Sequence, residues 1–131
     1  MKMLVAYLAS LVAFVGADFL WLGRMGDSFY RPAMGAMALD GFRLGPAVVF
    51  YLLYAFGIVV FAIQPALAAQ SWKLALAYGL LFGLIGYGVY DLTNQATLKS
   101  WPLALTLVDM SWGACLTGLA ALAGYFASRA L

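Results

Sequence analysis

Charged residues are scarce in this 131-residue chain, at 9% of the sequence against about 25% in ordinary soluble domains. Hydrophobic residues make up 66%, which is far above the roughly 45–50% of a soluble globular protein. The chain contains no histidine and no glutamate, and it has a single cysteine. These absences exclude haem and di-iron sites with histidine ligands and Ser-His-Asp triads. The composition excludes a water-soluble globule and predicts a small membrane protein.

Four apolar stretches are each long enough to cross the roughly 30 Å hydrocarbon core of a bilayer as a helix. They cover residues 3–22, 46–67, 74–98 and 103–126. No stretch alternates between apolar and polar residues with a period of two, which argues against a barrel. The sequence therefore predicts an all-α integral membrane four-helix bundle, one transmembrane domain over residues 1–131, in which successive helices are antiparallel neighbours.

One long connection, at about residues 23–45, joins the first two stretches. It mixes arginine and aspartate with aromatic residues and methionine, a pattern that suits an amphipathic segment on the membrane surface. Its glycines and Pro32 suit a solvated loop equally well, so both interpretations stay open. The lysines and arginines divide evenly between the two sides of the predicted bundle, and the positive-inside rule therefore does not choose an orientation.

Three of the five aspartates, Asp18, Asp91 and Asp109, lie inside the apolar stretches. Because successive helices run in opposite directions, the end of the first, the end of the third and the start of the fourth face the same side of the membrane. The rise per residue places each aspartate about 9–12 Å in from that side. We therefore expect the three carboxyl groups to lie in one layer.

Aromatic and polar side chains from all four predicted helices reach the same layer. They are Trp21, Tyr51, Tyr54, Tyr87, Asn94 and Trp112. No lysine or arginine lies at this depth, and an unpaired carboxylate inside a membrane costs several kcal/mol. Three arrangements that satisfy the acids stay open: protonation or hydrogen bonds to these neighbours, pairing with Arg24, Arg31 or Arg43 folded inward from the long connection, or binding of a cationic ligand or metal.

Small residues recur every three to four positions on three predicted helices, as in membrane helices that pack closely. They are Ala9, Ala13 and Ala17 on the first helix, Gly79, Gly83 and Gly86 on the third, and Gly113, Thr117, Ala120 and Gly124 on the fourth. We expect these faces to hold the bundle together. Cys115, in the fourth helix, is expected to be a small buried hydrophobe.

Several motifs make the chain similar to a known family. The most specific runs from Tyr90 to Pro102, and shorter ones stand at residues 18–23, 29–31, 50–54 and 108–113. Over nearly its whole length the chain resembles the bacterial domain-of-unknown-function family 2177, whose members are four-helix membrane proteins. The resemblance implies a multi-pass protein of the bacterial inner membrane. It also implies an association with lipid modification, because members often lie near genes for fatty-acid cyclopropanation, but it gives no catalytic residues.

We interpret the acidic layer as a pocket for a lipid or another cationic amphiphile, in a protein accessory to lipid modification. Asp18, Asp91 and Asp109 would contact the cationic head, supplemented by Asn94, and the aromatic side chains would line the pocket. Arg24 and Arg31 would hold a phosphate at the surface. The alternatives are a small proton- or cation-coupled transporter acting as a dimer, a lipid-modifying enzyme, or a structural membrane subunit.

No cofactor is predicted from the sequence, and whether the protein is an enzyme stays open. Carboxylates suit Mg²⁺ or another divalent cation, and the ligands of such a metal would be Asp18, Asp91 and Asp109. The expected partners are membrane lipids and, for a transporter, a second copy of the chain. Nucleic acid is not expected, because the net charge is only +2 and is dispersed.

Overall fold

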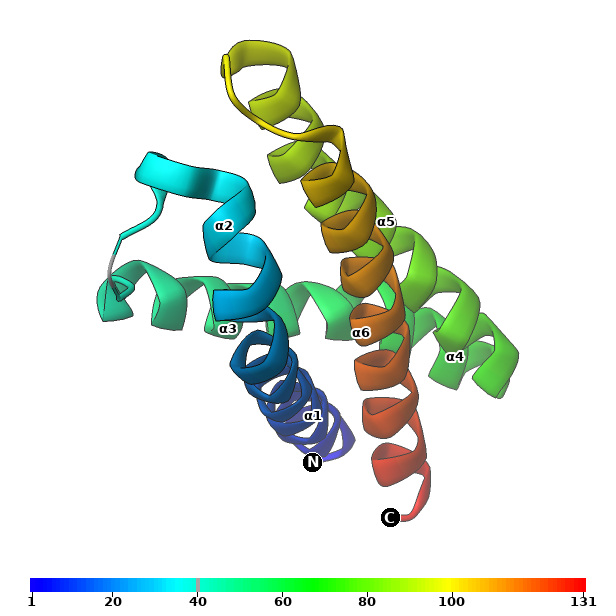
Figure 1. Ribbon diagram of the computed structural model, residues 1–131. Coiled ribbons are helices and arrows are strands. Elements are labelled where there is room, and N and C mark those ends of the chain that lie inside the picture. Colours follow the sequence, from blue (N-terminus) through cyan, green and yellow to red (C-terminus); the bar gives the residue numbers. More distant parts are fainter. Residues whose placement is uncertain (40) are drawn as a thin grey trace.

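The computed structural model describes residues 1–39 and 41–131, and the elements in this part of the chain are all helices (Figure 1). The long helices are α1 (Lys2–Met25), α3 (Leu44–Ile58), α5 (Trp72–Thr97) and α6 (Leu103–Arg129). The π-helical turn η3 (Val59–Ile63) and the short helix α4 (Gln64–Ala69) continue α3 without a break. A left-handed residue, Gln70, ends α4, and the Ser71 side chain caps α5 by accepting a hydrogen bond from the Leu74 amide.

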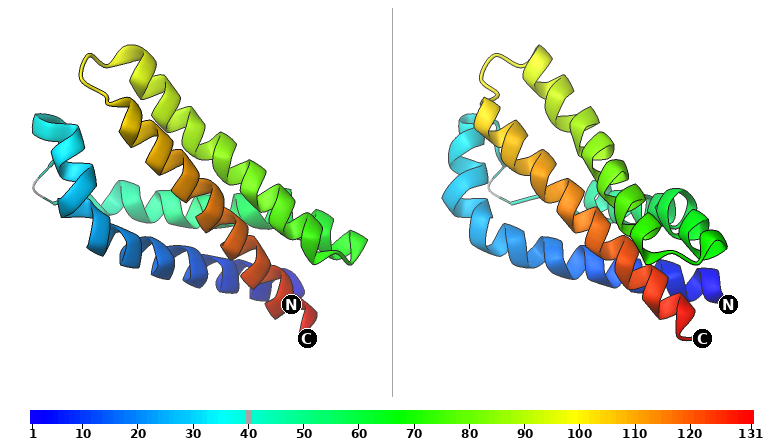
Figure 2. Two further views of the ribbon diagram at one scale, coloured as in Figure 1. Left: turned by 45° about the vertical axis from the view of Figure 1, so that its right-hand side comes forward. Right: turned by 90° about the vertical axis from the view of Figure 1, so that its right-hand side faces the viewer.

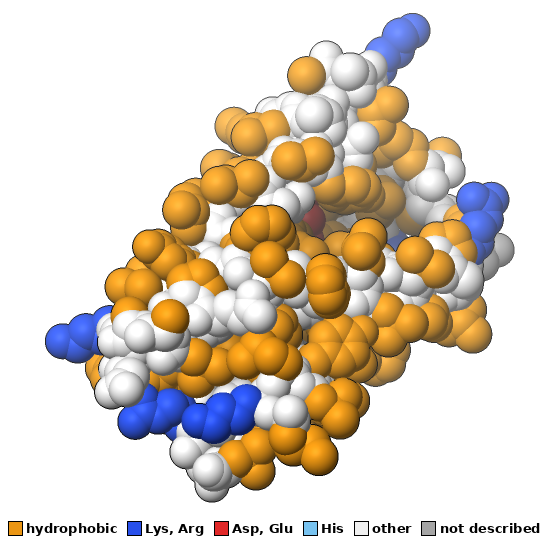
Figure 3. Space-filling model, turned by 180° about the vertical axis from the view of Figure 1, so that it is seen from behind, with side chains coloured by type: hydrophobic (Ala, Val, Ile, Leu, Met, Phe, Trp, Pro, Cys, Tyr) orange, Lys and Arg blue, Asp and Glu red, His pale blue; other side chains and the backbone are white. Residues whose placement is uncertain are grey.

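Four continuous helices are long and apolar enough to cross a membrane: Lys2–Met37, Leu44–Ala69, Trp72–Thr97 and Leu103–Arg129. Large apolar side chains stand exposed on their outer faces, including Val12 at 71%, Leu20 at 76% and Leu53 at 68%. Such faces favour contact with lipid over contact with water. Figure 3 shows one face of the molecule, where hydrophobic side chains cover the middle and lysines and arginines lie toward the ends. The prediction of an all-α protein with four helices of spanning length is confirmed.

The long connection after the first span is mostly helical. The π-helical turn η1 (Gly26–Tyr30), the helix α2 (Arg31–Met34) and the 3₁₀ turn η2 (Gly35–Met37) extend α1 and bend away from its axis (Figure 1). Pro32 lies in the first turn of α2, where its missing N–H is not needed. Gly35 ends α2 with a φ of 61°, a backbone angle that glycine adopts without strain. Most of this connection is therefore helical, and the loop that remains before α3 is shorter than the expected one.

The helix α6 is the centre of the packing. It lies along α5 on one side and along α1 on the other, as both views of Figure 2 show. The buried face of α1 is a stripe of every fourth residue: Ala6, Ser10, Phe14 and Asp18. Because this stripe faces the core from Ala6 to Asp18, the packing that holds α1 also places the Asp18 carboxyl inside the protein.

Glycines allow α5 and α6 to approach closely. A Cβ atom on Gly83 would lie 2.3 Å from the Gly113 carbonyl oxygen, and one on Gly79 would lie 2.8 Å from the Ala121 Cβ. The expectation that small residues hold these two helices together is confirmed for these positions. Gly86 differs, because it faces the ring of Tyr54 on α3.

The helix α3 crosses α5 and α6 at an angle instead of running alongside them (Figures 1 and 2). Near its end the chain packs against α5 through η3 and α4, while the earlier part of α3 packs mainly on α1. The helices α3 and α5 consequently separate toward the end of α5 that carries Tyr90 and Asp91, and this divergence positions the site described below.

The single cysteine differs from its expected environment, because the Cys115 side chain is exposed on the outer face of α6. In a membrane this face contacts lipid, so a membrane-impermeant maleimide is expected to leave the intact protein unlabelled. The same reagent is expected to label Ser100→Cys, in the exposed α5–α6 connection, when that change is made in a Cys115→Ser background and both sides of the membrane are open to the reagent. Equal labelling rates for the two cysteines in such open membranes would contradict the membrane-spanning position of α6, and unfolding in detergent serves as the positive control for Cys115.

Candidate functional site

Three carboxyl groups meet at one cavity of about 200 Å³. Asp18 comes from α1, Asp91 from α5 and Asp109 from α6. The other lining residues are Leu22, Tyr30, Met34, Tyr87, Tyr90, Trp101 and Leu105. The three aspartates that were expected at one depth in the membrane thus line one common space. We call this space the acidic cavity.

The Asp18 carboxyl accepts hydrogen bonds at both of its oxygen atoms. The Tyr51 hydroxyl donates to Oδ2 at 2.6 Å, and the Trp112 indole N–H donates to Oδ1 at 3.1 Å. Tyr51 belongs to α3 and Trp112 to α6, so one carboxyl ties three helices together. This carboxyl is therefore satisfied by the protein itself.

The Asp109 carboxyl is satisfied in part. Its Oδ1 accepts a hydrogen bond from the Tyr30 hydroxyl at 2.9 Å, and the Trp21 indole N–H donates to the same hydroxyl oxygen at 2.9 Å. The rings of Trp21 and Trp112 stack with centroids 4.3 Å apart and planes 8° from parallel. The stacked pair joins the hydrogen bonds of Asp109 to those of Asp18 and fixes both carboxyls in place.

The Asp91 carboxyl has no donor from the protein. The residue is 0% exposed, no N–H or O–H group among the described residues reaches either of its oxygen atoms, and its polar neighbour is the Asp109 carboxyl, close enough for the two to share a proton. A buried polar group without a partner costs about 1–3 kcal/mol, and a charged one costs more. Since Asp91 lines the acidic cavity, the missing partner is either a proton or a molecule that enters this space.

A second and larger space of about 750 Å³ adjoins the acidic cavity. It is an open groove between α3 and α5, and Tyr87, Tyr90 and Asp109 line both spaces. Its other lining residues are apolar apart from Tyr54: Phe50, Leu53, Tyr54, Phe56, Gly57, Phe61, Phe82, Gly86 and Val89. Figure 3 shows a hollow in this face with an acidic side chain at its bottom, surrounded by hydrophobic side chains.

Aromatic rings form a continuous wall along this aromatic groove. The ring centroids of Phe50 and Tyr54 lie 5.2 Å apart, those of Tyr54 and Phe82 lie 5.0 Å apart, and those of Phe61 and Phe82 lie 5.5 Å apart. Tyr54 is held in this row because its hydroxyl forms a 2.9 Å hydrogen bond with the Thr117 hydroxyl. The groove is therefore a rigid apolar surface, with its polar end at Asp109.

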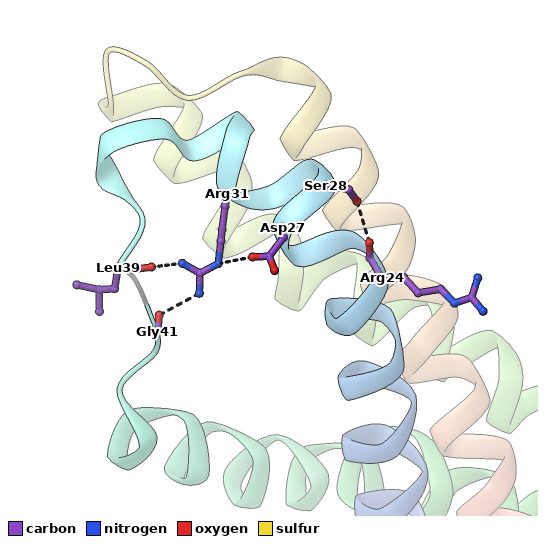
Figure 4. A network of polar contacts seen from close by, with 6 residues as sticks. All are labelled: Arg24, Asp27, Ser28, Arg31, Leu39 and Gly41. Carbon is purple, nitrogen blue, oxygen red and sulfur yellow. Dashed lines mark hydrogen bonds and ion pairs between the residues drawn. The ribbon is translucent and has the colours of Figure 1, made fainter.

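The arginines expected at the site lie elsewhere. Arg31 forms an ion pair with Asp27 at 3.1 Å and donates to the backbone carbonyls of Leu39 and Gly41 (Figure 4). Arg24 is exposed, and its side chain extends away from this cluster. Neither arginine lines the acidic cavity or the aromatic groove, because the i, i+4 contact with Asp27 and the loop carbonyls hold Arg31 at the outer surface.

The remaining predicted residues divide into three groups. Tyr87 lines both spaces and Tyr54 lines the groove, whereas Trp21, Tyr51 and Trp112 hold the carboxyls from outside the cavity. Asn94 does not line either space. It lies three residues after Asp91, about 4.5 Å further along α5 toward the end of that helix.

Sequence reasoning did not assign Tyr30, Tyr90 and Trp101 to the site, although all three line the cavity. Tyr30 was expected in a loop or surface segment, and its position depends on the helical extension of α1. Trp101 is buried, and its indole N–H donates to the Thr106 hydroxyl at 3.0 Å. The sequence does place Tyr90 next to the site, because it directly precedes Asp91.

The carboxyl groups do not form a metal-ligand set. Within residues 1–39 and 41–131, no group of three or more histidine, cysteine, aspartate or glutamate side chains is placed to hold a metal ion. The alternative in which Asp18, Asp91 and Asp109 ligate a divalent cation therefore gains no support from this arrangement. Asp18 in particular directs both oxygen atoms at protein donors.

Comparisons with known proteins agree with the fold. No curated protein and no solved structure matches the chain. The sequence profile of a family described as predicted membrane proteins, DUF2177, matches residues 3–126, which is nearly the whole chain. The chain therefore belongs to the DUF2177 family of predicted membrane proteins.

Proposed function

We propose that the protein binds a cationic amphiphile, such as a lipid, from within the bacterial inner membrane. The cationic head would occupy the acidic cavity and the hydrocarbon chain would lie in the aromatic groove. The observation that carries this proposal is the junction of the two spaces at Tyr87, Tyr90 and Asp109. A ligand that reaches both must combine a small polar end with a long apolar part.

The charges of the site support a cation. Three carboxyl groups line the acidic cavity, and none of its described lining residues is a lysine or arginine. Protein hydrogen bonds compensate Asp18 fully and Asp109 in part, but they leave Asp91 uncompensated. Tyr87, Tyr90 and Trp101 add aromatic faces, which attract cations.

The shape of the site supports capture of the ligand from the lipid phase. The aromatic groove is open on the face of the molecule shown in Figure 3, and its volume of about 750 Å³ falls within the roughly 300–1,000 Å³ of ligand sites. An opening on this apolar face admits a chain directly from the bilayer. This position favours binding of a lipid over transport through the centre of the bundle, for which a dimer would be needed.

Replacing Asp91 with asparagine tests the proposal. The protein is extracted in a mild non-ionic detergent, and the lipids that remain bound are measured by native mass spectrometry. We expect Asp91→Asn to reduce retained cationic amphiphile about tenfold or more, because a hydrogen bond to a charged group contributes about 1.5–3 kcal/mol. Asparagine keeps the size of the side chain and removes its charge.

Asp27→Asn is the matched control. Asp27 lies at the outer surface, where its side chain is 96% exposed and pairs with Arg31. The same chemical change there is expected to leave the bound amphiphile unchanged. If Asp91→Asn retains as much as the wild type, the acidic cavity does not bind the cationic head, and a proton-coupled or structural role for Asp91 gains weight.

A further inference from the structure

We propose that the acidic cavity selects a primary ammonium group and that the ligand carries no phosphate beside it. This inference rests on the proposed function and specifies its ligand as a long-chain amphiphile ending in R–NH₃⁺. It follows from the number and position of the oxygen atoms that the protein leaves free.

Three carboxylate oxygen atoms are available at the acidic cavity. Both oxygens of Asp18 already accept hydrogen bonds, from Tyr51 and from Trp112. Asp109 accepts one bond, from Tyr30 at Oδ1, and among the described residues no donor reaches its Oδ2. Asp91 contributes two further acceptors, because it is fully buried and no N–H or O–H group in the part of the chain that the structure describes reaches either oxygen; its polar neighbour is the Asp109 carboxyl, which offers acceptors as well.

A primary ammonium group matches these acceptors in number. It carries three N–H donors on one small charged nitrogen, as lysine does. A single R–NH₃⁺ group between Asp91 and Asp109 can therefore satisfy the two free oxygens of Asp91 and Oδ2 of Asp109. A quaternary ammonium group has no N–H donor, so it neutralises charge but leaves the buried Asp91 oxygens without hydrogen bonds.

A phosphate beside the ammonium group does not fit this site. Phosphates in proteins are bound by arginine, by lysine or by backbone amides at helix N-termini. Neither space has a lysine or arginine among its described lining residues, and Arg31 is engaged with Asp27 and loop carbonyls. A phosphate at the junction would face Asp109 with no basic residue beside it. The favoured class is therefore a cationic amphiphile, such as a long-chain amine or an aminoacyl ester of a lipid.

The junction between the two spaces fixes how such a ligand would lie. Asp109 lines both the acidic cavity and the aromatic groove, so an ammonium group held there has its first carbons beside Tyr87 and Tyr90. The chain then continues along the row of Tyr54, Phe82 and Phe61. The occupant of the groove is thus the hydrocarbon chain of the amine itself.

Three amphiphiles with the same twelve-carbon chain test the inference: dodecylamine, dodecyltrimethylammonium and lauroyl lysophosphatidylethanolamine. Each is titrated into the delipidated protein in non-ionic micelles at neutral pH, and the bound fraction is measured by native mass spectrometry. The first two place the same charge on the micelle, so a difference between them reports recognition of the N–H groups. We expect dodecylamine to bind at least about tenfold more tightly than either of the others.

The outcomes separate this inference from the proposed function. Equal binding of the primary and quaternary amphiphiles overturns the primary-ammonium inference but leaves a cationic-amphiphile site intact. Equal binding of dodecylamine and the lysophospholipid overturns the exclusion of phosphate. Failure of all three to bind overturns the proposed function itself. In Asp91→Asn the preference for dodecylamine over the quaternary compound is expected to fall below about threefold, and an unchanged preference would show that another residue makes the selection.

Discussion

Gly83→Ala is expected to disrupt the α5–α6 pair and to lower the free energy of unfolding by about 3 kcal/mol. The new methyl carbon would lie 2.3 Å from the Gly113 carbonyl oxygen and 2.7 Å from the Thr117 Cβ. A flexible side chain can rotate away from such a contact, but a backbone carbonyl in a helix cannot. The two helices must therefore move apart along their closest contact.

The consequences of this movement extend to the site. Gly113 also contacts Tyr87, since a Cβ on Gly113 would lie 2.2 Å from the Tyr87 Cγ. Tyr87 lines both the acidic cavity and the aromatic groove. Separation of α5 from α6 would thus displace Asp91 relative to Asp109, and we expect ligand binding to fall together with stability.

Gly16→Ala provides the matched control for this prediction. Gly16 lies within α1, and no atom outside its immediate chain neighbours is found within 4 Å of the position that its Cβ would occupy. The same chemical change is expected to be neutral or slightly stabilising there, because alanine favours a helix more than glycine does. Thermal unfolding followed by circular dichroism, together with the monodisperse fraction on size-exclusion chromatography, measures both variants. Similar behaviour of Gly83→Ala and Gly16→Ala would contradict the close packing of α5 on α6.

The level of the acidic residues could be predicted from the sequence, because depth in a helical bundle depends only on rise per residue and chain direction. That arithmetic put Asp18, Asp91 and Asp109 in one layer, and the structure places them around one cavity. Their hydrogen bonds could not be predicted in the same way. The partner of Asp109 is Tyr30, which reaches it only because α1 continues as a helix into the following segment.

The position of Arg31 follows from a local contact that the sequence spacing indicates. Asp27 and Arg31 are spaced i, i+4, which is the separation of an ion pair on one helix face. Once this segment is helical, a local partner for Arg31 is favoured over a reach into the cavity. The phosphate-binding role of Arg24 and Arg31 at the surface stays a prediction, and neither residue lines the acidic cavity or the aromatic groove.

The aromatic groove could not be predicted from sequence patterns. Phe50, Phe61 and Phe82 are apolar residues in span-length helices, and such residues serve equally well against lipid, against another helix or against a ligand. These residues line a groove because α3 crosses α5 at an angle. Two glycines also leave room for the rings: Gly57 faces the Phe82 ring, and Gly86 faces Tyr54. That angle is a property of the whole packing and not of any one helix.

Asp18→Leu is expected to lower the free energy of unfolding by about 2 kcal/mol, whereas Asp18→Asn is expected to change it by less than about 0.5 kcal/mol. Leucine has a similar size but accepts no hydrogen bond, so the Tyr51 hydroxyl and the Trp112 indole N–H would both lose their acceptor. The amide of asparagine can replace both contacts. Its oxygen can accept from Trp112, whose N–H only donates, and its NH₂ can donate to the Tyr51 oxygen, which also accepts.

A double-mutant cycle with Tyr51→Phe isolates the contact of Asp18 with α3. In the Asp18→Leu background, removal of the Tyr51 hydroxyl is expected to be neutral or stabilising, because that hydroxyl is already without its acceptor. Unfolding by a denaturing detergent, followed by tryptophan fluorescence, to which the stacked Trp21 and Trp112 contribute, measures all four proteins. If Asp18→Asn destabilises as strongly as Asp18→Leu, then the charge of Asp18 is required. Asp18 would in that case act as a third anion facing the ligand, not as the hydrogen-bonded tie between α1, α3 and α6 that the geometry describes.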